Sequence, residues 1–164
     1  IVSLREEAMA FVCHPGHRLA RRKSVLPGDL HGEAFIAFDP ELTIRKSIDR
    51  ALRQRNVKVN IVMEFDNIET IKQAIIIAAG VSILPRHTVQ KEASIRTLAA
   101  VEVGIPDLVR PVGIVHRRHR RLTPTAERFV QMLQEASDTR EGLRTVSRRN
   151  ANGEFLEGGK RPLQ

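Results

Sequence analysis

Short apolar runs alternate along the chain with segments whose apolar residues recur every three or four positions. The short runs stop at turn-forming residues, which is typical of buried strands, and they predict strands over residues 8–13, 34–38, 57–63, 81–85, 95–103 and 110–115. The periodic segments predict helices over residues 43–55, from Asp66 to just before Gly80, over 87–93, and from Thr123 onward. This alternation predicts an α/β fold with a largely parallel sheet.

The two central helices have recognisable ends and faces. Thr43 is the expected cap of the first helix and Asn56 the residue that ends it. Its buried face is predicted to hold Ile44, Ile48, Ala51 and Leu52, and its opposite face Arg45, Lys46, Asp49, Arg50 and Arg53. Asp66 or Asn67 is the expected cap of the second helix, and Gly80 its terminator. The buried stripe of that helix is predicted to hold Ile68, Ile71, Ala74, Ile75 and Ala78.

Composition narrows the class of protein. A chain of 164 residues with 41% hydrophobic residues can fill the core of one ordinary domain. Its net charge of +8 indicates either a polyanionic partner or simply a basic host proteome. Six Phe without any Tyr or Trp argue against a platform for single-stranded nucleic acid. The single Cys13 excludes an internal disulfide and suits a reducing compartment, so we expect a cytoplasmic location. No signal peptide is visible after Ile1, and the longest apolar stretch, 74–79, is too short to span a membrane, so we expect no membrane partner.

The sequence shows no set of catalytic residues. There is no nucleophile-elbow motif, and no paired carboxylates lie at helical spacing on an apolar face, so we expect no enzyme activity and no cofactor. Cys13, His14 and His17 could suggest a metal site. However, they share one tight turn around Pro15-Gly16, and the chain offers no second cluster to supply a fourth ligand. We therefore expect no metal.

Four motifs, taken together and in order, resemble the effector domain of LysR-type transcriptional regulators. They are the hinge segment 11–20, residues 26–30 followed by 34–38, residues 67–74 followed by 79–85, and the closing segment 122–129. Ser82 stands where a second Gly is common in that family. The resemblance implies a two-lobed, periplasmic-binding-protein-like (type 2) fold. Residues 68–74 and 86–88, with the basic segment 116–121, look most like the carbon-fixation and sulfur-assimilation subgroups.

The resemblance also implies a domain organisation. Residues 1–13 would end the first lobe, 14–112 would form the whole second lobe, 113–136 would return to the first lobe, and 137–164 would be a disordered tail. The winged helix-turn-helix that binds operator DNA would lie outside this chain. Family members pair through their effector domains, so we expect a dimer or tetramer. The alternative is a solute-binding protein of a transport system, which has the same fold.

The expected ligand is a small anionic metabolite bound between the lobes. Two helix starts, 39–43 and 66–70, would face that cleft and offer free N–H groups, and the hinge would line it. The predicted ligand-binding residues are Thr43, Asn67, Ile68, Thr70, His14 and Asp39. The plainer interpretation is that Thr43, Asp66 and Asn67 are ordinary caps and that Thr70 is a first-turn residue. The basic segment 116–121 could contact nucleic acid, which would make the chain a polyanion binder, or it could be a solvated loop.

Overall fold

The computed structural model describes the backbone of residues 2–116 and 122–150, and side chains as far as Ser137 in the last helix. The chain forms two compact units, one of residues Glu6–Pro111 and one of residues Ile1–Arg5 and Val112–Gln164. The first unit contains the two predicted helix starts and is therefore the one that matters for the site. None of the helices described is long and apolar enough to cross a membrane.

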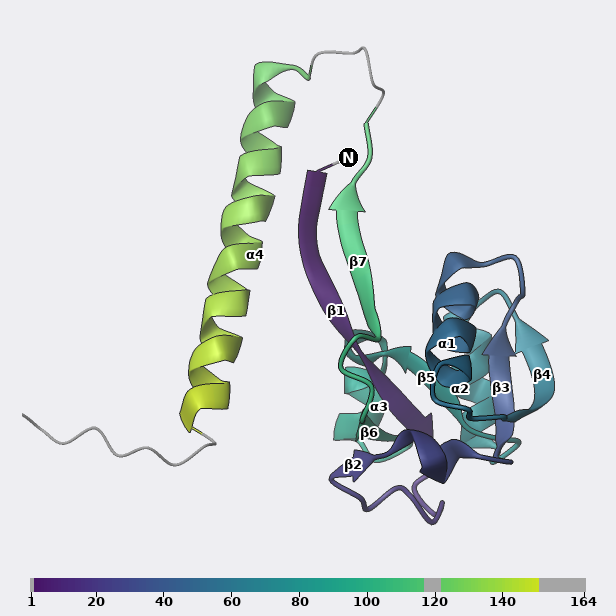
Figure 1. Cartoon of the computed structure of the whole chain (residues 1–164). Helices are drawn as coiled ribbons and strands as arrows, with labels where there is room; N and C mark the ends of the chain where they lie inside the picture. Colours follow the sequence, from purple (N-terminus) through teal and green to yellow (C-terminus); the bar gives the residue numbers. More distant parts are fainter. Residues whose placement is uncertain (1, 117–121, 151–164) are drawn as a thin grey trace, which may run out of the picture. The chain divides into compact units, whose positions relative to one another are not determined.

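The larger sheet is mixed, not largely parallel as predicted (Figure 1). Its central strand, β1 (Val2–Cys13), lies between β5 (Ser82–Pro85) and β6 (Ala99–Val103) and is antiparallel to both. The short strand β2 (Ser24–Val25) runs parallel to β6, and β7 (Val109–Ile114) also pairs with β1. The prediction failed because the order of strands along the chain does not reveal that β1 runs antiparallel to the strands on either side of it.

The second sheet is parallel, as expected. It pairs β3 (Ala34–Phe38) with β4 (Asn60–Phe65), and their last residues, Phe38 and Phe65, are register partners. An isolated parallel bridge between Phe35 and Val81 joins β3 to the start of β5. The helices α1 (Thr43–Arg53) and α2 (Ile68–Ile76) follow β3 and β4 respectively, so each helix begins where a parallel strand ends.

One apolar core holds the sheets and helices of this unit together. Side chains that are fully buried come from both sheets and both helices, and the largest include Phe11, Ile36, Ile48, Ile71 and Ile83. Two short 3-10 helices, η1 (Pro27–Leu30) and η2 (Arg86–Val89), and the single turn α3 (Gln90–Ser94) complete the unit. The strand predicted from residue 95 begins only at Ala99, because Arg96 has a left-handed backbone with φ 59°.

The start of α1 and the end of α2 differ from the predictions. The N-cap of α1 is Leu42, not Thr43, which is the first helical residue. The α2 helix stops at Ile76, and Ala78, not Gly80, takes the left-handed conformation (φ 60°) that closes it. Gly80 is needed for another reason: a Cβ there would lie 2.6 Å from the carbonyl oxygen of Ala34.

In the other unit, α4 (Pro124–Asn150) begins as predicted, with Pro124 at its first position. The hydroxyl of Thr123 accepts a hydrogen bond from the Ala126 N–H at 3.3 Å, as its predicted capping role requires. The helix continues past Ser137 to Asn150, so residues 137–150 of the predicted tail are helical. Residues 151–164 lie outside the described part of the chain.

Candidate functional site

The carboxyl ends of the parallel strands meet at one edge of the Glu6–Pro111 unit. At this edge the Asp39 N–H donates to the Phe65 carbonyl at 2.9 Å, which holds the exits of β3 and β4 together. Met9 of β1 is the register partner of Pro85, the last residue of β5, and so belongs to the same edge. We call this the carboxyl edge; open α/β sheets bind ligands outside it.

The start of α2 is closed by its own cap. Asn67 Oδ1 accepts a hydrogen bond from the Glu69 N–H at 2.7 Å, as predicted for a cap. Ile68 is half-buried and packs against the core, whereas Thr70 is exposed. Of these residues, Asn67 and Thr70 therefore present polar groups at the carboxyl edge, and Ile68 contributes packing.

The start of α1 is open. Asp39 Oδ1 accepts from the Glu41 N–H at 2.8 Å, and the Leu42 N–H donates to the Asp39 carbonyl at 3.1 Å, so this turn closes on itself before the helix begins. Leu42 has no side chain that can cap the helix, and no side-chain cap is formed. The first-turn N–H groups of α1 and the exposed Thr43 hydroxyl are consequently available to an acceptor from outside the helix.

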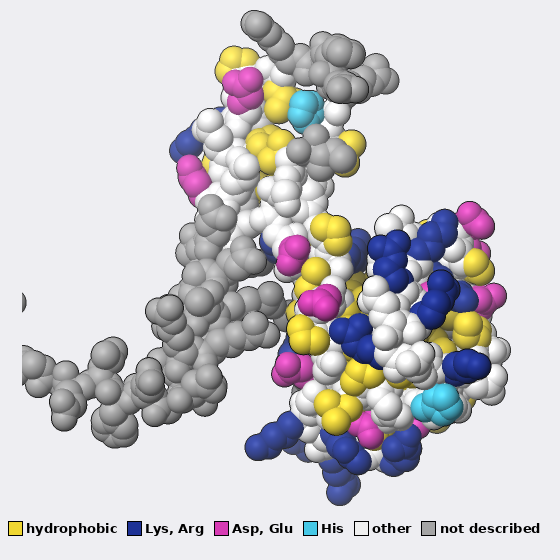
Figure 2. All heavy atoms as spheres, in the orientation of Figure 1, with side chains coloured by type: hydrophobic (Ala, Val, Ile, Leu, Met, Phe, Trp, Pro, Cys, Tyr) yellow, Lys and Arg dark blue, Asp and Glu magenta, His cyan; other side chains and the backbone are white. Residues whose placement is uncertain are grey.

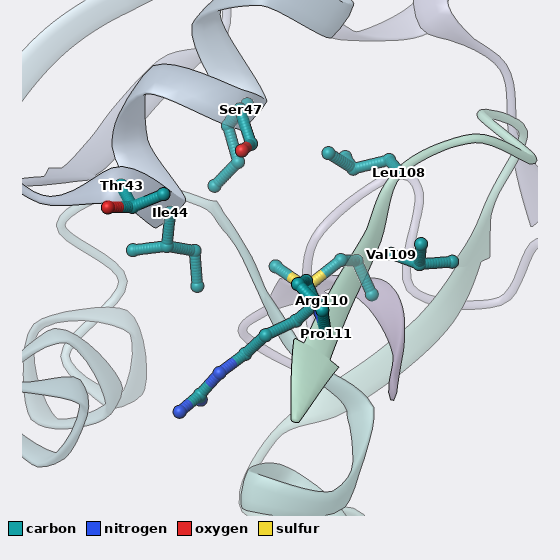
Figure 3. A pocket seen from close by; sticks show the side chains of 9 residues that line it. Thr43, Ile44, Ser47, Leu108, Val109, Arg110 and Pro111 are labelled. Atoms are coloured by element: carbon teal, nitrogen blue, oxygen red, sulfur yellow. The ribbon is translucent and has the colours of Figure 1, made fainter. Parts of the chain in front are cut away.

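A cavity of about 170 Å³ opens beside the start of α1 (Figure 3). Its floor is apolar and includes the buried side chains of Met9, Ile48 and Leu108. Its lip is polar, with the exposed Thr43, Ser47 and Arg110. The other lining residues are Ile44, Val109 and Pro111.

Basic side chains follow one exposed side of α1. Lys46, Arg50 and Arg53 recur along this side, with Arg50 and Arg53 in the last turn, away from the cavity, and Figure 2 shows Lys and Arg side chains gathered over the helix. At the other end, the start of α1 carries partial positive charge, which favours an anion beside the cavity.

His14 does not join the other predicted residues. It lines a separate cavity of about 490 Å³ with Glu33, Ala34 and Gly80, at the amino end of β3, whereas Asp39 follows the carboxyl end of that strand. Its Nδ1 accepts a hydrogen bond from the Gly16 N–H at 3.0 Å. Because β3 has five residues in extended conformation, its first and last Cα atoms are about 13 Å apart. The motif placed His14 at the hinge, but the direction of β1 puts its end at the opposite edge.

Arg45 is a buried charge that sequence reasoning placed on the exposed face of α1. Its guanidinium donates to both carboxylate oxygens of Asp49 at 3.0 and 2.9 Å, to Glu64 Oε1 at 2.7 Å, and to the carbonyl of Phe38. Burial alone would lower the pKa of Arg45, but the bonds to Glu64 and Asp49 outweigh it and raise that pKa. Arg45 thus ties α1 to the ends of both parallel strands. The spacing of Arg45 and Asp49 was visible in the sequence, but nothing in it indicated Glu64.

Lys72 is a second buried charge that the sequence did not indicate. Its Nζ lies 2.7 Å from Glu92 Oε1 and 2.8 Å from Glu69 Oε1, and it donates to the Thr88 carbonyl at 3.1 Å. Burial opposes the charge of Lys72, yet the two carboxylates raise its pKa, and the bond from Lys72 lowers the pKa of Glu92. The cluster links α2 to η2 and α3, the elements after β5.

Cys13 and His17, two of the residues considered as metal ligands, lie at either end of the turn at residues 13–17. Cys13 is fully buried, and burial, with the nearby charge of Glu33, raises the pKa of its thiol to about 12. His17 is held by Glu33, with Nε2 and Oε2 at 3.2 Å. Within the described part of the chain, no three His, Cys, Asp or Glu side chains are grouped to hold a metal ion. Of the basic segment, residues 117–121 lie outside the described residues.

Comparisons of the sequence with a family model and with curated proteins identify the same family. Residues 1–138 match the model of the LysR substrate binding domain. The chain is 33% identical over 137 residues to the HTH-type transcriptional regulator CbbR of Rhodospirillum rubrum, a match that covers 83% of this chain and 45% of CbbR. The chain thus spans less than half the length of this curated relative.

Two solved structures have a similar fold. The CcmR regulatory domain of Synechocystis PCC6803, in complex with 2-PG, matches with a TM-score of 0.73 and 21% identity, over 82% of this chain and 65% of that one. The effector binding domain of QuiR, in complex with shikimate, matches with a TM-score of 0.72 and 16% identity, over 84% and 65%. At these identities the likeness shows the fold, and it agrees with the predicted periplasmic-binding-protein-like architecture.

Proposed function

Since the chain belongs to the LysR substrate-binding domain family, we propose that it is the effector-sensing part of a LysR-type transcriptional regulator. The effector is a small anionic metabolite, and its site is the carboxyl edge of the Glu6–Pro111 unit. The curated relative CbbR is a transcriptional regulator and not a transport protein, which favours regulation over the solute-binding alternative. Binding without catalysis suits the role of this family.

The observation that carries the proposal is the open start of α1. Most exposed helix starts are closed by a side chain, as α2 is closed by Asn67, but α1 has only Leu42 at that place. An anion there would accept hydrogen bonds from the first-turn N–H groups and from the Thr43 hydroxyl. Asn67 and Thr70, at the start of the helix that follows the neighbouring strand, would supply further polar contacts.

Transmission to DNA would be a shift in population. An effector that prefers one arrangement of units or subunits stabilises that arrangement in proportion to its preference. Operator DNA would bind through a winged helix-turn-helix outside these 164 residues, and self-association as a dimer or tetramer would bring two or more such domains together.

The names of the relatives indicate which subgroup of regulators the chain resembles. They include CbbR of Rhodospirillum rubrum and a RuBisCO operon transcriptional regulator of Allochromatium vinosum, which supports the resemblance to the carbon-fixation subgroup. The complexes of CcmR with 2-PG and of QuiR with shikimate support a small-molecule ligand for this chain as well.

A thermal-shift screen of small carboxylates and phosphate esters on this chain would identify binders, because a ligand of the native state raises the apparent stability. Replacing Asn67 and Thr70 together by Ala should weaken a positive hit at least about tenfold, since a hydrogen bond to a charge is worth roughly 1.5–3 kcal/mol. The cap loss should cost only about 1 kcal/mol of stability.

The matched variant Asn67→Asp separates the two roles of Asn67. Asp caps a helix as well as Asn does, so the stability of the chain should be kept. Its added negative charge should nevertheless repel the anion. If both variants fold and bind the hit as the unaltered chain does, the site has been placed wrongly.

A further inference from the structure

We infer that the cavity beside the start of α1 selects the effector as a small carboxylic acid with a compact apolar body, and that Arg110 recognises its carboxylate. This inference rests on the proposed function and adds to it the chemical class of the ligand. The start of α1 alone would accept any small anion, whereas a cavity with an apolar floor discriminates among anions.

The size and lining of the cavity specify the body of the ligand. Met9, Ile48 and Leu108 form a floor that is 5%, 1% and 5% exposed, so these side chains are fixed by the core and the floor is preformed. A cavity of about 150 Å³ lined by apolar side chains accommodates benzene, and this one measures about 170 Å³. A group about the size of one six-membered ring therefore fills it.

The lip specifies the charged end of the ligand. Arg110 is exposed, and among the described residues it has neither an ion pair nor a hydrogen bond from its side chain. Figure 3 shows its side chain extending from β7 toward the side on which Thr43 and Ile44 lie. The planar guanidinium can bind a carboxylate through two parallel hydrogen bonds, and Thr43 and Ser47 offer hydroxyls at the same lip.

This arrangement ranks ligands in a definite order. A carboxylic acid with an apolar ring uses both the floor and the lip, its amide uses the floor alone, and inorganic phosphate uses the lip alone. The acid is expected to bind more tightly than the amide. The binding of phosphate is expected to depend most steeply on salt, because its attraction is wholly electrostatic.

The composition of the chain makes the test direct. With no Trp or Tyr, the chain does not compete with a fluorescent aromatic ligand. We would therefore titrate the 164-residue chain into anthranilate and, separately, anthranilamide, and follow the fluorescence anisotropy of each probe. Anthranilate is expected to bind about fivefold more tightly, the gain typical of an ion pair at an exposed lip.

Three variants assign the interactions. Arg110→Gln should lower the affinity for anthranilate and leave the affinity for anthranilamide unchanged. Ser47→Leu, at an exposed position of α1, should fill the cavity and weaken both probes at least tenfold. Arg50→Gln is the matched control: it removes an exposed charge from α1 but lies outside the cavity lining, and it should change neither affinity by more than the small effect of one distant charge.

The outcomes separate this inference from the proposed function. Equal affinities for acid and amide, or a loss that Arg50→Gln reproduces in full, would overturn the assignment of Arg110. Binding that Ser47→Leu leaves unchanged in a folded protein would overturn the assignment of the cavity. If effectors from the thermal-shift screen depend on Asn67 and Thr70 but on neither Arg110 nor Ser47, the proposed function stands and this inference fails.

Discussion

Replacing Gly80 by Ala should destabilise the Glu6–Pro111 unit although it adds only one methyl group. The new Cβ would lie 2.6 Å from the carbonyl oxygen and 3.2 Å from the carbonyl carbon of Ala34. Both atoms belong to the backbone of β3, so no side-chain movement can relieve the contact. The chain must separate at the bridge where β3 meets Val81.

The magnitude follows from what that separation breaks. The bridge consists of two hydrogen bonds of 2.8 Å, from the Val81 N–H to the Ala34 carbonyl and from the Ile36 N–H to the Val81 carbonyl. Each contributes about 0.5–1.5 kcal/mol, and residual backbone strain adds about 1–3 kcal/mol. We expect the free energy of unfolding to fall by about 2–6 kcal/mol.

Urea denaturation followed by far-ultraviolet circular dichroism measures this change, since the chain has no Trp or Tyr to report by fluorescence. Gly28→Ala is the matched control, because nothing lies within 4 Å of a Cβ at Gly28 and its backbone is not left-handed. That variant should be neutral or more stable by up to about 1 kcal/mol. A Gly80→Ala protein within about 0.5 kcal/mol of the unaltered chain would refute the steric argument.

Three further outcomes are expected from the same structure. Ala78→Gly should stabilise the chain by about 0.5–1 kcal/mol in the same denaturation assay, because Gly relieves the left-handed strain at φ 60°, and a loss of stability would contradict this. The folded-state pKa of Glu92 is lowered by Lys72, so the stabilisation from this pair is present above the ordinary Glu pKa and is lost as the pH falls through the lower folded value. Denaturation of Glu92→Gln at a series of pH values should therefore show a shallower loss of stability toward acid, and a slope equal to that of the unaltered chain would exclude this contribution. Val62→Lys should weaken self-association, measured by light scattering, because β4 is the last strand of its described sheet and Val62 is 42% exposed there; an unchanged mass would place the interface elsewhere.

The elements themselves could be predicted because their signals are local. The Asn67 cap, the left-handed Asn56 after α1 and Pro124 at the first position of α4 all depend on residues within a few positions of each other. Thr43 was predicted to be the cap of α1, whereas it is the first residue inside the helix, and this error also has a local cause. Its residue type suits a cap, but the turn at Asp39 closes on Leu42 first.

The errors arose where distant segments meet. Gly80 was assigned to a helix end because the sequence does not show its close contact with Ala34. The two residues are 46 positions apart and meet only in the folded chain. Arg45 was placed on the exposed face because Glu64 and the Phe38 carbonyl, which satisfy its charge, come from other elements. His14 was grouped with the helix starts because a motif gives position along the chain and not the direction of β1.

The burial of Cys13 has a practical consequence for labelling experiments on this chain. The chain has this one cysteine, it is fully buried, and burial raises the pKa of its thiol to about 12, which disfavours the reactive thiolate at neutral pH. Maleimide dyes will therefore leave it unmodified and will label cysteines introduced at exposed positions. A donor and acceptor pair at Ser3 and Gln73, one in each compact unit, would report the distance between the units before and after an effector is added. The native thiol can stay in place throughout, so the core that surrounds it remains unaltered in the labelled protein.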